Sequence, residues 1–399
     1  MRHISWYFKA LVVCVVFAGV AGCDDSVDFK NATPGSITIT KDLCYLSGGD
    51  VVELNSSATD PDEDEISFGW AATGGVFSPV SGEGRSVTWT APTESGTYTL
   101  TLSVFDGIDT GSKSIDIEVG EVILLLPGSN EYFDNGSYYI YSQAAHITVR
   151  FLTSLILHEG VTIIFDNEYA GITVEGDFQA LGKPGNPVVL RTNYCPGDSE
   201  EEWEGVKFQG EHAIGIMKYC EISNAYTGVS VRDYATVTLD TISISDSAEF
   251  GIEIYNMSNV EITGCKIWDN GRGIRSNDSD VTIRNSSIRY NYQFGIHAGG
   301  EAAPNLDIEY SNVSNNVEGF LLSDAARPRV KNCSIFLNEA GINKYGVRLY
   351  EYDGGGVLDF TENFWGETTY GSIAAMIHTQ GGNATVDFSD WLDESPAEN

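Results

Sequence analysis

The side chains best suited to chemistry in this 399-residue sequence recur at one position, two residues after a repeated glycine. Cations can donate hydrogen bonds to sugar hydroxyls, and a carboxylate or an imidazole can transfer protons in a reaction. In chain order the position holds Lys207, Ser230, Glu253, Arg275, His297, Leu321 and Arg348. Two residues farther along, Arg232 and Tyr255 add a guanidinium and an aromatic ring. We therefore predict a ligand-binding row made of Lys207, Arg232, Tyr255, Arg275, His297 and Arg348.

A catalytic interpretation of the row rests on three of these residues. Glu253 or His297 would act as a general base, with Arg275 beside them. Ordinary solvent-facing strands carry similar side chains, so a row without any binding function stays open as a further alternative.

The elements that must position this row follow a repeat of about 22 residues. The repeated glycines are Gly205, Gly228, Gly251, Gly273, Gly295, Gly319 and Gly346. One apolar column holds Ile222, Ile244, Ile267, Ile288, Val313 and Ile335, and another holds Leu239, Ile262, Ile283 and Ile308. Asparagine recurs at Asn270, Asn291, Asn316 and Asn338. Three short alternating strands per period predict a coil of stacked parallel strands, and a sandwich of evenly spaced strands is the alternative.

These repeats resemble the right-handed parallel β-helix repeat family, the pectate-lyase-like superfamily, over residues 121–390. Residues 155–190 resemble its N-terminal turns, and the segments Asn363–Gly366 and Val386–Trp391 resemble its closing segment. The resemblance implies an all-β chain with a parallel β-helix and its cap over residues 120–390 and a tail over 391–399.

Known motifs of the resembling enzymes are missing. Pectinolytic hydrolases of this fold share Asn-Thr-Asp, Asp-Asp, Gly-His-Gly and Arg-Ile-Lys, and none of these occurs in the repeat region. A compact acidic cluster beside a cationic base, which the lyases need for Ca²⁺, is not evident either. We therefore predict non-catalytic binding or adhesion to a glycan or envelope polymer. A polysaccharide lyase or hydrolase with an unfamiliar site is the first alternative, and a structural spacer is the second.

Residues 36–119 follow a different pattern of longer alternating strands, which predicts a small β-sandwich. The run Asp60-Pro61-Asp62-Glu63-Asp64 with the later Val104-x-Asp106-Gly107 resembles a PKD or cadherin-like immunoglobulin module, usually a spacer or adhesive unit. Because three alternating carboxylates offer the hard oxygens that Ca²⁺ prefers, calcium is the one cofactor predicted. Its predicted ligands are Asp60, Asp62, Asp64 and, if the strands pair as in the resembling modules, Asp106. A solvated acidic turn is the alternative.

The first 22 residues have the pattern of a secretory signal peptide. Basic residues precede an apolar run from Ala10 to Gly22, which is too short to span a bilayer of about 30 Å as a helix. Cys23, which follows directly, resembles the cysteine of a bacterial lipobox, and this implies removal of residues 1–22, lipidation of Cys23 and a tether over 23–35. An ordinary signal peptide with an incidental cysteine is the alternative. We expect a lipid-anchored protein of the bacterial cell envelope, at the outer membrane or cell surface rather than the inner membrane.

The net charge argues against a nucleic-acid-binding protein, and the cysteines and histidines argue against a disulfide framework or a zinc site. The formal net charge of −35 repels nucleic acid, so the expected partners are a polysaccharide and, through the anchor, a membrane. Cys220, Cys265 and Cys333 share an inward column, but two and three turns separate them by about 10 and 14 Å, beyond the limit of about 7 Å for a disulfide. Cys44 and Cys195 have no obvious partner, and no histidine pair has zinc-ligand spacing.

Overall fold

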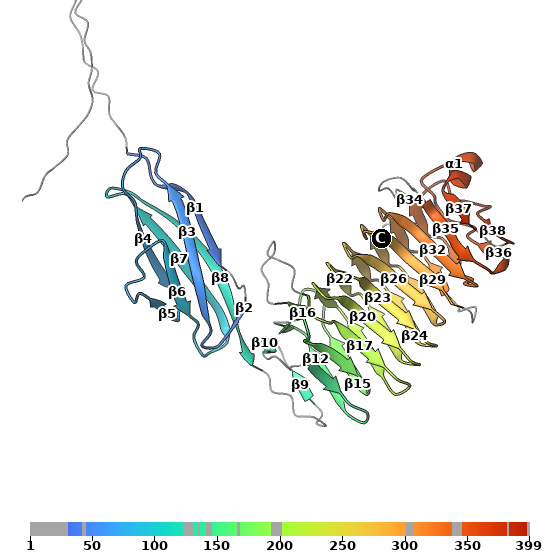
Figure 1. Ribbon diagram of the computed structural model, residues 1–399, viewed down its shortest axis with the longest axis horizontal. Coiled ribbons are helices and arrows are strands. Elements are labelled where there is room, and N and C mark those ends of the chain that lie inside the picture. Colours follow the sequence, from blue (N-terminus) through green and yellow to red (C-terminus); the bar gives the residue numbers. More distant parts are fainter. Residues whose placement is uncertain are drawn as a thin grey trace, which may run out of the picture.

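The computed structural model describes residues 31–41, 45–122, 131–133, 136–140, 146–165, 168–192, 202–300, 306–336, 345–380 and 383–396. In these residues antiparallel sheets precede a parallel β-solenoid of about eight turns (Figure 1). The predicted all-β fold with a parallel β-helix is therefore confirmed. The leader at 1–22, Cys23, Cys44 and Cys195 lie outside the described residues. Within the described ranges, no helix is both long and apolar enough to cross a membrane.

The N-terminal part consists of two small sheets that enclose their own apolar core. One sheet has the order β1 (Gly35–Lys41), β3 (Val51–Thr59), β6 (Ser86–Thr90) and β5 (Val76–Ser78). The other joins β4 (Ser67–Ala72), β7 (Gly96–Phe105) and β8 (Thr110–Val122), with β2 (Tyr45–Ser47) beside β8. Trp70 and Trp89 are buried between them, and their indole nitrogens donate to backbone carbonyls. The longer strands agree with the predicted pattern of alternating strands, whereas β2 and β5 have only three residues each.

Strand β8 connects this part to the solenoid. Its first residues pair antiparallel with β7, and its last residues, Glu121 and Val122, pair parallel with Tyr138 and Tyr139. β8 therefore runs across the boundary predicted at residue 119, and the exact domain limits stay a prediction.

Three parallel sheets form the faces of the solenoid, one strand from each sheet per turn. We call the ten-stranded sheet the site sheet. It consists of β11 (His146–Val149), β14 (Gly171–Val174), β17 (Val206–Gln209), β20 (Thr227–Arg232), β23 (Phe250–Tyr255), β26 (Arg272–Asn277), β29 (Phe294–Gly299), β32 (Glu318–Asp324), β35 (Tyr345–Tyr352) and β37 (Ile377–Gln380).

The second sheet follows the site sheet along each turn. Its strands are β9 (Glu131–Phe133), β12 (Ser154–His158), β15 (Asp177–Leu181), β18 (Ile214–Lys218), β21 (Thr236–Asp240), β24 (Asn259–Thr263), β27 (Asp280–Arg284), β30 (Leu306–Glu309), β33 (Arg329–Lys331), β36 (Gly355–Asp359) and β38 (Asn383–Asp387).

The third sheet completes each turn and continues into β8. Its solenoid strands are β10 (Gly136–Ile140), β13 (Val161–Phe165), β16 (Val188–Thr192), β19 (Cys220–Ser223), β22 (Ser243–Ser245), β25 (Lys266–Trp268), β28 (Ser287–Arg289), β31 (Asn312–Ser314) and β34 (Ser334–Phe336). Helix α1 (Tyr370–Ala375) lies at the C-terminal end of the stack (Figure 1).

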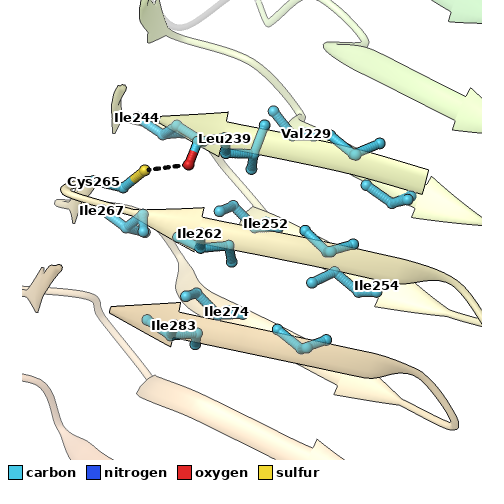
Figure 2. Packing of buried hydrophobic residues seen from close by; sticks show 14 of the residues in the cluster. Val229, Leu239, Ile244, Ile252, Ile254, Ile262, Cys265, Ile267, Ile274 and Ile283 are labelled. Atoms are coloured by element: carbon cyan, nitrogen blue, oxygen red, sulfur yellow. Dashed lines mark hydrogen bonds between the residues drawn. The ribbon is translucent and has the colours of Figure 1, made fainter. Parts of the chain in front are cut away.

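Columns of aliphatic side chains from the three sheets meet inside the solenoid. Figure 2 shows Ile252 of the site sheet, Ile262 of the second and Ile267 of the third on one turn, with like residues on the turns before and after. All three are fully buried. Because burial of one such side chain stabilises a fold by about 1.5–3 kcal/mol, these predicted columns hold the turns together.

The corners of each turn are made by residues in the left-handed backbone region. Between the second and third sheets the φ angle lies between +47° and +67° at Tyr219, Thr241, Gly264, Asn285, Tyr310 and Asn332. Between the third sheet and the site sheet it is +54° to +58° at Asn224, Asp246, Asp269, Tyr290 and Asn315. Asparagine, aspartate and glycine tolerate this region best and fill seven of these eleven positions, and tyrosine or threonine fills the other four.

The repeated asparagines form a buried ladder along the second of these corners. Asn291 Oδ1 accepts hydrogen bonds from the backbone nitrogen and Nδ2 of Asn270, and Asn316 Oδ1 does the same for Asn291. The predicted stacking of this column is confirmed for these three residues. Asn338 lies outside the described residues.

The repeated glycines leave room for this ladder. A Cβ atom built on Gly273 would lie 2.2 Å from the carbonyl oxygen of Gly295 and 3.0 Å from Nδ2 of Asn291. At Gly273 glycine is therefore required by the close approach of the next turn, whereas the φ angle of +96° at Gly205 also requires glycine for its backbone conformation.

Candidate functional site

The predicted row is continuous on the outer face of the site sheet. The strand register pairs each member with the next, in the order Lys207, Ser230, Glu253, Arg275, His297, Leu321 and Arg348. Glu253, Arg275 and His297 thus lie on consecutive strands. Arg232 and Tyr255 also pair with each other and flank the row. The strands hold these side chains at the backbone spacing of about 4.8 Å.

The row extends two strands beyond the predicted residues at its N-terminal end and one strand at its C-terminal end. Thr148 pairs with Thr173, which pairs with Lys207, and Arg348 pairs with His378. Thr173 follows Gly171 by two residues, so the glycine rule could have found it. His378 has no glycine before it, and the sequence carried no signal for its place.

A flanking row that the prediction missed lies beside the first. It consists of the residue directly before each repeated glycine, namely Glu204, Thr227, Phe250, Arg272, Phe294, Glu318 and Tyr345. The register pairs Phe250 with Thr227 and Arg272, and it pairs Glu318 with Phe294 and Tyr345. The sequence repeat itself could have revealed this row, because each member stands one residue before a repeated glycine.

Carboxylates of the flanking row, together with Glu249 in the corner before this row and Glu253 in the central row, neutralise most of the cations. Lys207 Nζ lies 3.8 Å from Glu204 Oε2, and Arg348 Nη1 lies 2.5 Å from Glu318 Oε1. Arg272 forms an ion pair with Glu249, which precedes Phe250. Within the central row, Arg275 Nη1 lies 3.5 Å from Glu253 Oε1. The row is therefore a mixed-charge surface and not a cationic one.

Glu253 is the carboxylate of the central row, and its side chain is 21% exposed. Burial raises its pKa above the ordinary value, while the nearby guanidinium groups of Arg275 and Arg232 act in the opposite direction. The Glu253 carboxylate is thus partly desolvated and lies near two positively charged guanidinium groups.

His297 is neutral near neutral pH because burial, reinforced by Arg275, lowers its pKa to about 4. Its Nε2 lies 3.0 Å from Ser323 Oγ, which donates to Asp324 Oδ2 at 2.8 Å. Because the single hydroxyl proton of Ser323 points to the carboxylate, Nε2 of His297 must be the donor and Nδ1 carries the lone pair. The row therefore offers an imidazole acceptor at this position and no positive charge.

Aromatic rings hold the guanidinium groups in place. Arg272 and Arg275 lie 5.1 and 5.8 Å from the centroid of Phe250. Arg232 lies 5.5 Å from the ring of Tyr255. Such contacts restrict the side chains and leave their N–H groups directed away from the ring.

The residues predicted to bind calcium hold turns in the N-terminal sheets. Asp60 Oδ1 accepts hydrogen bonds from the backbone nitrogens of Asp62 and Asp64, and Asp62 Oδ2 accepts one from Ala32. Asp106 accepts from Asn31, whose hydrogen bond lowers its pKa, and from the nitrogens of Ile108 and Asp109. Throughout the described part of the chain, no three His, Cys, Asp or Glu side chains gather closely enough to hold a metal. Calcium binding stays a prediction.

The three described cysteines are free and buried, as their spacing predicted. Burial raises the pKa of Cys220 and Cys333 to about 12 and that of Cys265 to about 11. Their thiols donate to backbone carbonyls of the stack, as Figure 2 shows for Cys265 and Leu239. They are packing residues without nucleophilic character.

Comparison with known proteins supports the architecture. The family described as a right handed beta helix region matches residues 199–335, which contain β17 to β34. The solenoid is therefore a right-handed parallel β-helix. A search of curated proteins gives no significant match.

Two solved structures show weak similarity to the chain. One is the A-module of a mannuronan C-5 epimerase from Azotobacter vinelandii, with 14% identity, a TM-score of 0.27 and coverage of 66% of this chain and 90% of that chain. The other is a nucleoside hydrolase-related hypothetical protein from Saccharophagus degradans that is associated with carbohydrate metabolism. It has 21% identity and a TM-score of 0.19, and the match covers 22% of this chain and 26% of that chain, about a quarter of its length.

Proposed function

We propose that the outer face of the site sheet binds an extended glycan and does not cleave it. The observation that carries this proposal is the unbroken register from Lys207 to Arg348 over seven consecutive strands. At about 4.8 Å per strand, the six intervals give a rigid row about 29 Å long. A polymer can contact such a row along its length, whereas a small metabolite would use only a fraction of it.

The arrangement of acids supports binding without cleavage. Hydrolysis of a glycosidic bond generally needs two carboxyl groups about 5–10 Å apart on either side of the bond. The neighbours of Glu253 in the row are Ser230 and Arg275, and its carboxylate faces the guanidinium of Arg275. The carboxylate of Glu249, whose charge acts on Glu253, is itself ion-paired with Arg272. A polysaccharide lyase or hydrolase remains the second candidate, because only strand β26 separates the strands that carry Glu253 and the acceptor nitrogen of His297.

We expect Lys207→Ala to weaken glycan binding about tenfold, because a hydrogen bond from a charged group contributes about 1.5 kcal/mol at the lower end of its range. The matched control is Lys218→Ala on the second sheet, since Lys218 is also ion-paired, to Asp240 at 2.7 Å. Affinity electrophoresis of the full-length protein, purified in mild detergent, against a panel of neutral and acidic polysaccharides measures both. An equal effect of the two variants would contradict the proposed face.

The same incubation separates the alternatives. New reducing or unsaturated chain ends that disappear in Glu253→Gln would establish an enzyme. If the protein retains no polysaccharide at all, the spacer becomes the better interpretation.

We also propose that lipidation of Cys23 anchors the protein in the bacterial cell envelope. The support is the succession of basic, apolar and small residues that ends at this cysteine. In the native host, Cys23→Ser is expected to move the protein from the membrane fraction to the soluble fraction. Unchanged fractionation of the variant would overturn the anchor.

A further inference from the structure

The charges on the binding face compensate one another. The seven strands from β17 to β35 on the site sheet carry five lysine and arginine residues, all of them described by the structure, namely Lys207, Arg232, Arg272, Arg275 and Arg348. Four of these have a carboxylate within ion-pair distance. Arg232 stacks on Tyr255, and its charge opposes the rise in the pKa of Glu253 that burial causes. Glu204, Glu249, Glu253 and Glu318 thus compensate four of the five positive charges.

This compensation disfavours an acidic ligand. A uronate carboxylate would have to compete with Glu253 for Arg275 or with Glu318 for Arg348, and it would be repelled by the carboxylate it displaced. The formal charge of −35 on the whole chain adds a long-range repulsion of any polyanion.

The same pairs fit hydroxyl groups. A sugar hydroxyl both accepts and donates a hydrogen bond, so it can accept from a guanidinium N–H and donate to the carboxylate beside it. Arg275 with Glu253 and Arg348 with Glu318 each offer such a donor and acceptor side by side. His297 adds an acceptor nitrogen between these pairs. A carboxylate on the ligand only accepts hydrogen bonds, so it can bind the guanidinium of each pair but not the carboxylate.

We propose that the ligand of this row is a neutral polysaccharide rather than a polyuronate. The inference rests on the proposed binding function and names its ligand class. Each ion pair on the site sheet acts as one hydroxyl-binding unit, and the pairs along the stack contact different sugars of one chain.

The test uses matched polymers, each a neutral polysaccharide and the polyuronate obtained by oxidising its primary alcohols, so that linkage and stereochemistry are shared. For the full-length protein, the neutral member of the bound pair is expected to have a Kd at least about tenfold lower, with little change between low and high salt. Tighter binding of the polyuronate at low salt, lost at high salt, would overturn the inference while leaving glycan binding intact. Retention of neither member in any pair would overturn the binding function itself.

A variant pair tests the cause of the preference. Glu253→Gln keeps the side-chain shape but removes the charge beside Arg275, so the ratio of the two Kd values should move several-fold toward the polyuronate. Glu261→Gln, on the exposed face of β24 in the second sheet, is the matched control and should leave the ratio unchanged. An equal ratio in Glu253→Gln and the unaltered protein would show that the pairs do not set the preference.

Discussion

Asn291→Ala should destabilise the solenoid by about 3 kcal/mol, because it leaves buried backbone groups without partners. Asn291 Oδ1 accepts from the backbone nitrogen of Asn270 at 3.2 Å, and its Nδ2 donates to the carbonyl of Ile267 at 3.3 Å and to Asn316 Oδ1 at 2.9 Å. No water can replace these bonds inside a closed corner where Asn270, Asn291 and Asn316 are at most 1% exposed. The shift of the urea unfolding midpoint, followed by circular dichroism, measures the loss.

The chain offers a matched control for this substitution. Asn312 is also buried, at 6% exposure, yet neither its Oδ1 nor its Nδ2 has a hydrogen-bond partner in the described structure. Asn312→Ala therefore removes a similar volume without breaking a bond and should change stability by less than about 1 kcal/mol. Comparable losses in the two variants would mean that side-chain volume, and not the ladder, stabilises the corner.

Gly273→Ala should cost more than about 3 kcal/mol, because its Cβ would overlap a backbone atom that cannot move alone. The atom is the carbonyl oxygen of Gly295, at 2.2 Å, on the next strand of the site sheet. Relief of the overlap requires the two strands to separate, and this would disturb the pairing of Arg275 with His297 in the row. Soluble yield and the unfolding midpoint of the variant measure the effect.

Substitutions at two further glycines test the same explanation even if Gly273→Ala fails to fold. At Gly346 the nearest atoms are side-chain atoms of Trp365 and Met376 at 3.2 and 3.3 Å, so Gly346→Ala should cost much less. At Gly371, in α1, nothing lies within 4 Å, and alanine there should be neutral or stabilising by up to about 1 kcal/mol. The expected order of stability is Gly371→Ala, then Gly346→Ala, then Gly273→Ala, and any other order would contradict the close-approach explanation.

The repeat made most of the solenoid predictable from sequence. In a parallel coil each turn lies directly on the one before, so a position in the period is also a position in space. For this reason the neighbours Glu253, Arg275 and His297 could be placed on consecutive strands without coordinates. The short strands β2 and β5 were not predictable in the same way, because three residues are too few to show an alternating pattern.

The ion pairs of the site were not predictable because they depend on corner length. The corner before Gly251 is one residue longer than the corner before Gly273, and the extra residue places Glu249 beside Arg272. A side-chain contact between neighbouring turns also depends on rotamers that the period does not encode. The sequence thus located Lys207, Arg232, Arg275 and Arg348 and missed Arg272, the ion pairs and with them the mixed charge of the row.

The stacking of like residues also determines how such a binding face can change during evolution. Each described turn contacts chiefly the turns directly before and after it through the same glycine, asparagine and aliphatic columns. Duplication or loss of one coding unit of about 22 codons would therefore insert or remove a whole turn while the packing of its neighbours is kept. The row would lengthen or shorten by one side chain at each such event. The length of the row in a descendant is in this way a heritable count of turns, independent of which residues occupy the row.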